Sequence, residues 1–101
     1  MAVDLVCYVS NTLSDVEEML ENLSGQHKEI FPKKFLISSA GKADSFHKEI
    51  ALEYGLNSQS VFLVSLNDKS AACLVLDIAK MLKKSFGEEN IIVLHGNETL
   101  I

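Results

Sequence analysis

The chain has 101 residues, of which 48% are hydrophobic, and its formal net charge is −5. This length predicts a single α/β domain over residues 1–101, and so much apolar surface excludes intrinsic disorder. All nine basic residues are lysine, and arginine is absent. Arginine makes most two-point contacts to phosphate and guanine, so we do not expect this acidic chain to bind nucleic acid.

The first third of the chain predicts a strand followed by an amphipathic helix. Residues 3–9 are apolar and rich in β-branched side chains, which favours a strand buried on both faces. Ser14 and Glu17 have the spacing of a capping box, with Ser14 as the helix N-cap. The apolar positions recur every three or four residues after it, and they are Leu13, Val16, Leu20 and Leu23.

The rest of the chain repeats this alternation. Strands are predicted at residues 34–38, 60–66 and 90–94. A short helix is predicted between a cap at Asp44 or Ser45 and Gly55, and a longer one from residues 67–68 to Phe86. Because residues 71–76 are apolar all round, the longer helix should be the most buried.

Alternating strands and helices, with strands apolar on both faces, favour a three-layer α/β/α fold. We expect a small, mostly parallel sheet of four strands, with helices on both sides as in flavodoxin-like or Rossmann-like proteins. The alternative is an α+β arrangement with one antiparallel edge. Residues 99–101 either fold back after a turn at 95–98 as a short antiparallel edge strand or form a frayed tail.

Cysteine and histidine usage indicates neither a disulfide framework nor a metal site. Cys7 and Cys73 lie far apart in apolar runs, where thiols usually behave as small buried hydrophobic groups. The three histidines lack ligand spacing, so no metal and no cofactor is expected. No signal-peptide pattern and no apolar run of about 20 residues is present, which predicts a cytoplasmic protein that does not bind membranes.

Negative charge is concentrated near the start of the chain. Residues 1–27 contain five acidic residues and no lysine, whereas from residue 28 onward nine acids balance nine lysines. Asp15, Glu18 and Glu21 are three residues apart, so they share one side of the predicted helix. Such a side either steers and binds a basic partner or is simply a solvated helix face.

A second candidate site depends on the predicted parallel sheet. The carboxyl ends of parallel strands meet at one edge, where ligands bind in open α/β sheets. That edge would bring together Ser10, Ser39, Asp68 and His95, which resemble the residue types of a hydrolytic site. The chain contains no Gly-x-Ser-x-Gly, P-loop or Gly-x-Gly-x-x-Gly motif to support this interpretation.

The absence of catalytic and cofactor motifs favours a non-enzymatic, protein-binding module. Its most concrete form is an acidic inhibitor or immunity-type protein that covers a basic surface of a partner protein through Asp15, Glu18 and Glu21. One alternative is a small hydrolase-like enzyme or ligand binder that uses the loops at the strand ends. Another is a homo-oligomeric scaffold, such as a homodimer, joined through a strand edge near residues 91–101.

Overall fold

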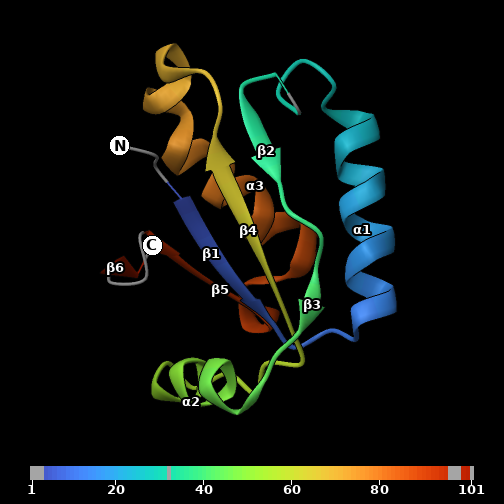
Figure 1. Ribbon diagram of the computed structural model, residues 1–101, viewed down its shortest axis with the longest axis vertical. Helices are drawn as coiled ribbons and strands as arrows, with labels where there is room; N and C mark the ends of the chain where they lie inside the picture. The colour runs from blue at the N-terminus through green and yellow to red at the C-terminus, as the bar shows by residue number, and fades with distance from the viewer. Residues whose placement is uncertain (1–3, 32, 96–98, 101) are drawn as a thin grey trace.

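The computed structural model describes residues 4–31, 33–95 and 99–100 (Figure 1). The strands are β1 (Asp4–Val9), β2 (Phe35–Ile37), β3 (Gly41–Lys42), β4 (Ser60–Leu66), β5 (Ile91–His95) and β6 (Thr99–Leu100). The α-helices are α1 (Leu13–Gln26), α2 (Ser45–Glu53) and α3 (Val75–Phe86), and two short 3-10 helices are η1 (Lys69–Leu74) and η2 (Glu88–Asn90).

The sheet is antiparallel, so the prediction of a mostly parallel sheet was wrong, although the mixture of α and β elements was right. The strand order is β2-β4-β1-β5-β6, β3 also pairs with β4, and every pairing is antiparallel. The edge strand at the C-terminus is present, with Thr99 opposite His95 and Leu100 opposite Leu94. The predicted turn at residues 95–98 includes residues 96–98, which lie outside the described part of the chain.

The helical crossovers explain the error. α3 joins β4 to β5, which run in the same direction, and α1 joins β1 to β2, which also run in the same direction. In each case one antiparallel strand lies between the two that the helix connects, as in a split β-α-β unit. Alternation along the sequence therefore indicated strand direction but not which strands are neighbours.

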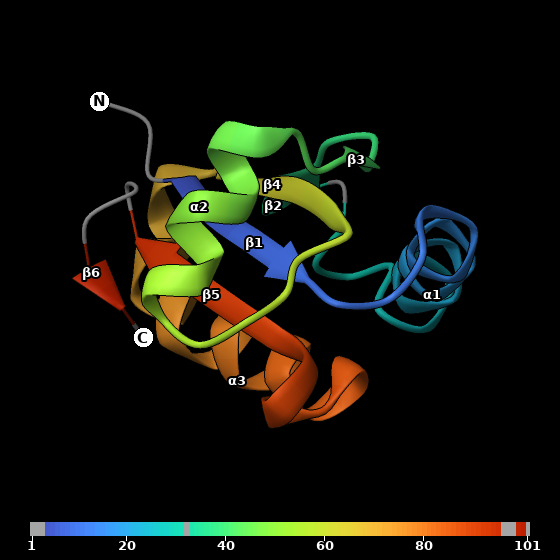
Figure 2. The ribbon, with the colours of Figure 1, turned by 90° about the horizontal axis from the view of Figure 1, so that it is seen from below.

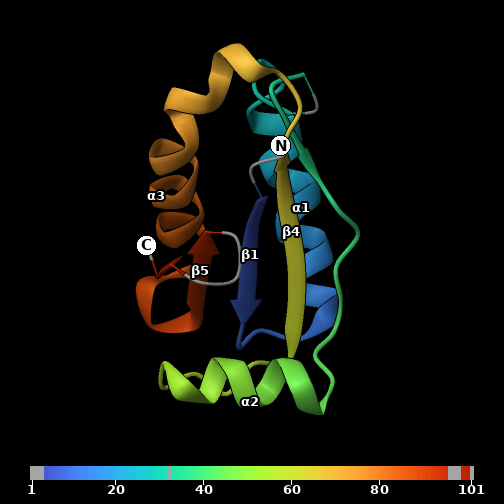
Figure 3. The ribbon, with the colours of Figure 1, turned by 60° about the vertical axis from the view of Figure 1, so that its left-hand side comes forward.

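The same crossovers place two helices on one face of the sheet. The connection from β4 to β5 starts from a strand that runs opposite to β1, and it moves along the sheet in the opposite direction to the connection from β1 to β2. Because both quantities are reversed, two right-handed crossovers place α1 and α3 on the same side of the sheet. Residues of α1 and α3 accordingly share one core cluster with alternate residues of β1, β4 and β5. The shorter α2 lies on the other face, across one end of the sheet (Figures 2 and 3).

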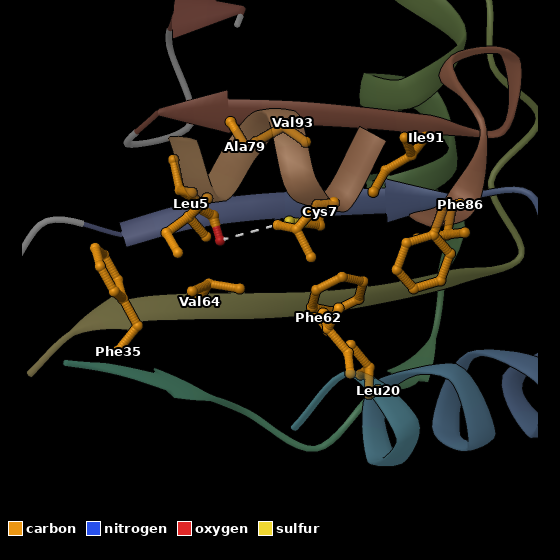
Figure 4. Packing of buried hydrophobic residues seen from close by; sticks show 14 of the residues in the cluster. Leu5, Cys7, Leu20, Phe35, Phe62, Val64, Ala79, Phe86, Ile91 and Val93 are labelled. Carbon is orange, nitrogen blue, oxygen red and sulfur yellow. Dashed lines mark hydrogen bonds between the residues drawn. The ribbon is translucent and has the colours of Figure 1, made fainter. Parts of the chain in front are cut away.

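The larger core contains Cys7 but not Cys73. Cys7 is fully buried in this cluster, which also contains Leu5 and Phe62 (Figure 4). Its Sγ lies 4.0 Å from the carbonyl oxygen of Leu5. Burial raises the pKa of its thiol. Cys73 is exposed, contrary to the prediction of two buried thiols. It lies in η1, whose tighter turn interrupts the expected long helix and leaves Ala72 and Leu76 exposed as well.

We expect core and surface leucines of α3 to differ sharply in their effect on stability. Leu82 is completely buried, whereas the side chain of Leu76 is 60% exposed. Leu82→Ala should lower the free energy of unfolding by about 2–5 kcal/mol because it leaves a cavity. Leu76→Ala is the matched control and should change it by less than about 0.5 kcal/mol. Urea unfolding measures both, and equal losses would contradict the described packing.

The N-cap of α1 is Thr12, two residues before the predicted Ser14. The Thr12 side-chain oxygen accepts a hydrogen bond from the Asp15 backbone N–H at 3.4 Å, and Thr12 has extended backbone angles. Thr12→Ala should therefore destabilise the protein by about 1 kcal/mol. Ser14→Ala should cost less than about 0.5 kcal/mol, because alanine is a better helix former. Thermal unfolding measures the stability of both variants. A larger loss of stability for Ser14→Ala than for Thr12→Ala would show that Ser14 is the N-cap, as the capping-box pattern predicted.

Candidate protein-binding site

Packing of α1 on the sheet determines where its charges lie. Val16, Leu20 and Leu23 are buried in the larger core. The acidic side chains of the helix consequently remain exposed, and we call Asp15, Glu17, Glu18 and Glu21 the acidic surface. At about 100° per residue, the three predicted contact residues span roughly 120° of the helix circumference. They therefore form a broad face rather than a narrow row.

The acidic surface is not neutralised within the described part of the chain. No described lysine forms a salt bridge with any of its four carboxylates, and the short contacts of His27 with Glu29 and of His47 with Asp44 involve other acidic residues. The last turn of α1 contains no basic residue either. These carboxylates are therefore available to a cation from another molecule.

A shallow groove of about 260 Å³ runs between α1 and the segment that joins β2 to β3. Glu17, Glu21 and Ser24 line it from the helix, and Ser38 and Ser39 line it from the opposite segment. We name it the acidic groove. Glu17 was predicted only as the capping partner of Ser14. The four-residue separation of Glu17 and Glu21 in the sequence could have indicated that the two carboxylates lie at the same site, because residues at that spacing are neighbours on a helix surface.

A second groove, of about 460 Å³, lies on the opposite face of the sheet. Val6 and Tyr8 of β1, Leu63 of β4, and Phe46 and His47 of α2 are among its lining residues, and we name it the apolar groove. Burial, with smaller effects of Tyr54 and Asp44, raises the pKa of Tyr8. A phenol is neutral near pH 7 even without this shift, because its ordinary pKa is about 10.

The four residues of the alternative ligand site do not come together. Ser10 follows β1 at one end of the sheet, whereas His95 ends β5 opposite Leu5, five strand residues or about 16 Å away. Asp68 follows β4, and Ser39 lies between β2 and β3. Because β4 and β5 run opposite to β1, Asp68 and His95 lie at one end of the sheet and Ser10 at the other, while Ser39 lies beside the middle of β4, so the expected common edge does not exist.

Two of these residues have local structural roles. The Ser10 hydroxyl donates to the Asn90 side-chain oxygen at 3.2 Å. The Asp68 carboxylate caps η1 and accepts from the Ser70 hydroxyl at 2.8 Å and the Ser70 backbone N–H at 3.0 Å. These hydrogen bonds, led by that of the hydroxyl, lower the pKa of Asp68. Both side chains are thus occupied in holding loops.

Metal and membrane chemistry find no support in the described residues. No group of three or more His, Cys, Asp or Glu side chains in residues 4–31, 33–95 and 99–100 is arranged to hold a metal ion. Over the same ranges, no helix is both long and apolar enough to cross a bilayer.

Comparison with known proteins identifies the family. The family model described as "CDI System Immunity Component" matches residues 1–99. "Immunity protein CdiI-2" of Burkholderia pseudomallei (strain 1026b) is 45% identical over 98 residues, which are 97% of this chain and 97% of that protein. A solved structure, the "CdiA-CT/CdiI toxin and immunity complex from Burkholderia pseudomallei", contains a chain with 43% identity and a TM-score of 0.93. The match covers 97% of this chain and 95% of that one. The prediction of an immunity-type, protein-binding module is confirmed, and the chain belongs to the family of CDI system immunity components.

Proposed function

We propose that this immunity protein inhibits a CdiA-CT toxin by binding it through the acidic surface of α1. The related Burkholderia chain was solved in a toxin and immunity complex, which makes a toxin of that class the natural partner. The observation that carries the assignment to α1 is that Asp15, Glu17, Glu18 and Glu21 are exposed without a described lysine partner. A basic toxin surface complements them.

The cost of this arrangement to the free protein supports a role in binding. Glu17 and Glu21 are four residues apart, and Glu18 is three residues from both Asp15 and Glu21. Like charges at these spacings destabilise a helix by about 0.2–0.5 kcal/mol per pair. Lysine or arginine side chains of a partner would relieve that repulsion. They would also speed encounter, because opposite charges steer two proteins together.

In this proposal the protein acts by covering the toxin, without catalysis and without a cofactor. We place it in the cytoplasm, where free thiols such as those of Cys7 and Cys73 remain reduced. Its action requires only that the complex forms faster than the toxin reaches its target. A net charge of −5, with no described lysine paired to an acid of α1, suits that requirement against a basic toxin.

Charge reversal on α1 tests the proposal. Glu18→Lys combined with Glu21→Lys should weaken binding to the CdiA-CT toxin of the Burkholderia pseudomallei complex about tenfold or more, mainly by slowing association. The wild-type affinity should itself fall as salt rises from about 0.05 to 0.5 M, because salt screens exposed charges. Surface plasmon resonance measures both rates.

The matched control is Glu49→Lys combined with Glu53→Lys, which makes the same charge change at exposed positions of α2. It should leave the association rate within about twofold of wild type once the change in net charge is allowed for. Equal losses for the two pairs, or salt-independent binding, would show that net charge or another surface carries recognition.

A further inference from the structure

Part of one sheet face is left without a covering helix. α2 has nine residues, about 14 Å of helix, whereas five strands side by side span about 19 Å. It covers Val6, Tyr8, Ile92 and Leu94 through Ala51 and Leu56. Toward β4 and β2 the face stays open, and Leu63 is 39% exposed and Leu36 44% exposed there.

The apolar groove lies between the start of α2 and this open region, and it is preformed. Its floor includes the buried side chains of Val6 and Tyr8, and its walls include Leu63 and Phe46, whose side chain is 64% exposed. The start of α2 is fixed because the His47 backbone N–H donates to the Asp44 carboxylate at 2.9 Å. Figure 2 shows α2 in front of β1 and β4, with β3 beside its first turn.

The two grooves adjoin each other across one segment of chain. Ser38 and Ser39 line both the acidic groove and the apolar groove. The Ser38 backbone N–H donates to the Leu63 carbonyl at 2.9 Å, and the Leu63 N–H donates to the Ser38 hydroxyl oxygen at 2.8 Å. Residues 38–39 are therefore held on β4 as a fixed ridge between a charged groove and an apolar one.

The charge beside the apolar groove and the need for an apolar contact favour a basic protein as the occupant of this groove. Exposed ion pairs contribute about 0–1 kcal/mol each, so the acidic surface alone does not give tight binding. Stable interfaces combine an apolar centre with a polar rim. A second copy of this chain is disfavoured, because docking at the ridge would bring two acidic α1 helices together on molecules that each carry −5.

We propose that the apolar groove receives a large apolar side chain of the toxin, from a segment that crosses the ridge at Ser38 and Ser39. A lysine or arginine of the same segment lies in the acidic groove against Glu17 and Glu21. This inference rests on the proposed function, and it adds the apolar anchor and the composition of the recognised segment.

The test separates apolar from charged contributions by their salt dependence. Phe46→Ala combined with Leu63→Thr should weaken binding of the Burkholderia pseudomallei CdiA-CT toxin about tenfold or more, mainly through faster dissociation, equally at about 0.1 and 1 M salt. Glu17→Gln combined with Glu21→Gln should slow association at low salt and lose most of its effect at high salt.

Leu52→Ala combined with Leu76→Ala is the matched control. Both side chains are 60% exposed and neither lines the apolar groove, so binding should stay within about twofold of wild type. Thermal unfolding checks that the groove variant is folded. Hydrogen exchange of the wild-type protein provides a readout without substitutions, and residues 36–42 should become protected in the complex.

The outcomes are distinguishable. If the wild-type protein does not bind the toxin, the proposed function fails. A second outcome is that the wild-type protein binds the toxin, that the α1 variants weaken this binding and that the groove variant does not. In that case only the groove inference is overturned. If light scattering shows a dimer that the groove variant dissociates, a second copy occupies the groove and the inference is also overturned.

Discussion

Burial of the apolar stripe of α1 against the sheet is the contact on which the rest of the surface depends. Val16, Leu20 and Leu23 enter the same core as Phe62 and Val93, so the rotation of the helix about its axis is fixed. Full burial of such side chains is worth about 1.5–3 kcal/mol each, far more than repulsion between neighbouring carboxylates costs. The helix can therefore carry four exposed acids that pair with no described lysine, and its edge can form a groove with residues 37–40.

The placement of helices has a comparable consequence for the opposite face. Because α1 and α3 share one side of the sheet, only the short α2 is available for the other side. A helix long enough to cross the whole face would have covered Leu63 and Leu36, whereas α2 leaves both of them partly exposed, with Leu63 and Phe46 lining the same groove. Exposed apolar side chains gathered at a groove are typical of interaction surfaces in proteins that fold alone.

Many local features were predictable from the sequence, although the cap at Thr12 and the 3-10 helix η1 were not, and strand adjacency was not predictable at all. The strand at residues 60–66 and the ends of the helices at Gly55 and Gly87 agree with the structure, since both glycines have positive φ angles of 82° and 89°. The acidic side of α1 also followed from residue spacing. Strand adjacency did not, because a helical crossover constrains direction while leaving room for an inserted strand. Ser10 and His95 were separated for that reason. β3 has only two residues and gave no periodic signal.

The two proposed contact surfaces would govern different stages of recognition. Carboxylates act over about 10 Å in dilute salt and need no close fit, so the acidic surface accelerates approach of many basic proteins. A preformed groove acts only at contact and discriminates by shape. A side chain that is too small leaves a cavity next to Val6 and Leu63, and one that is too large overlaps with them. An immunity protein must be both fast and selective. In the proposed complex, the fixed ridge of Ser38 and Ser39 joins the two grooves, so that one toxin segment would satisfy both requirements: the approach steered by charge would end where shape is tested.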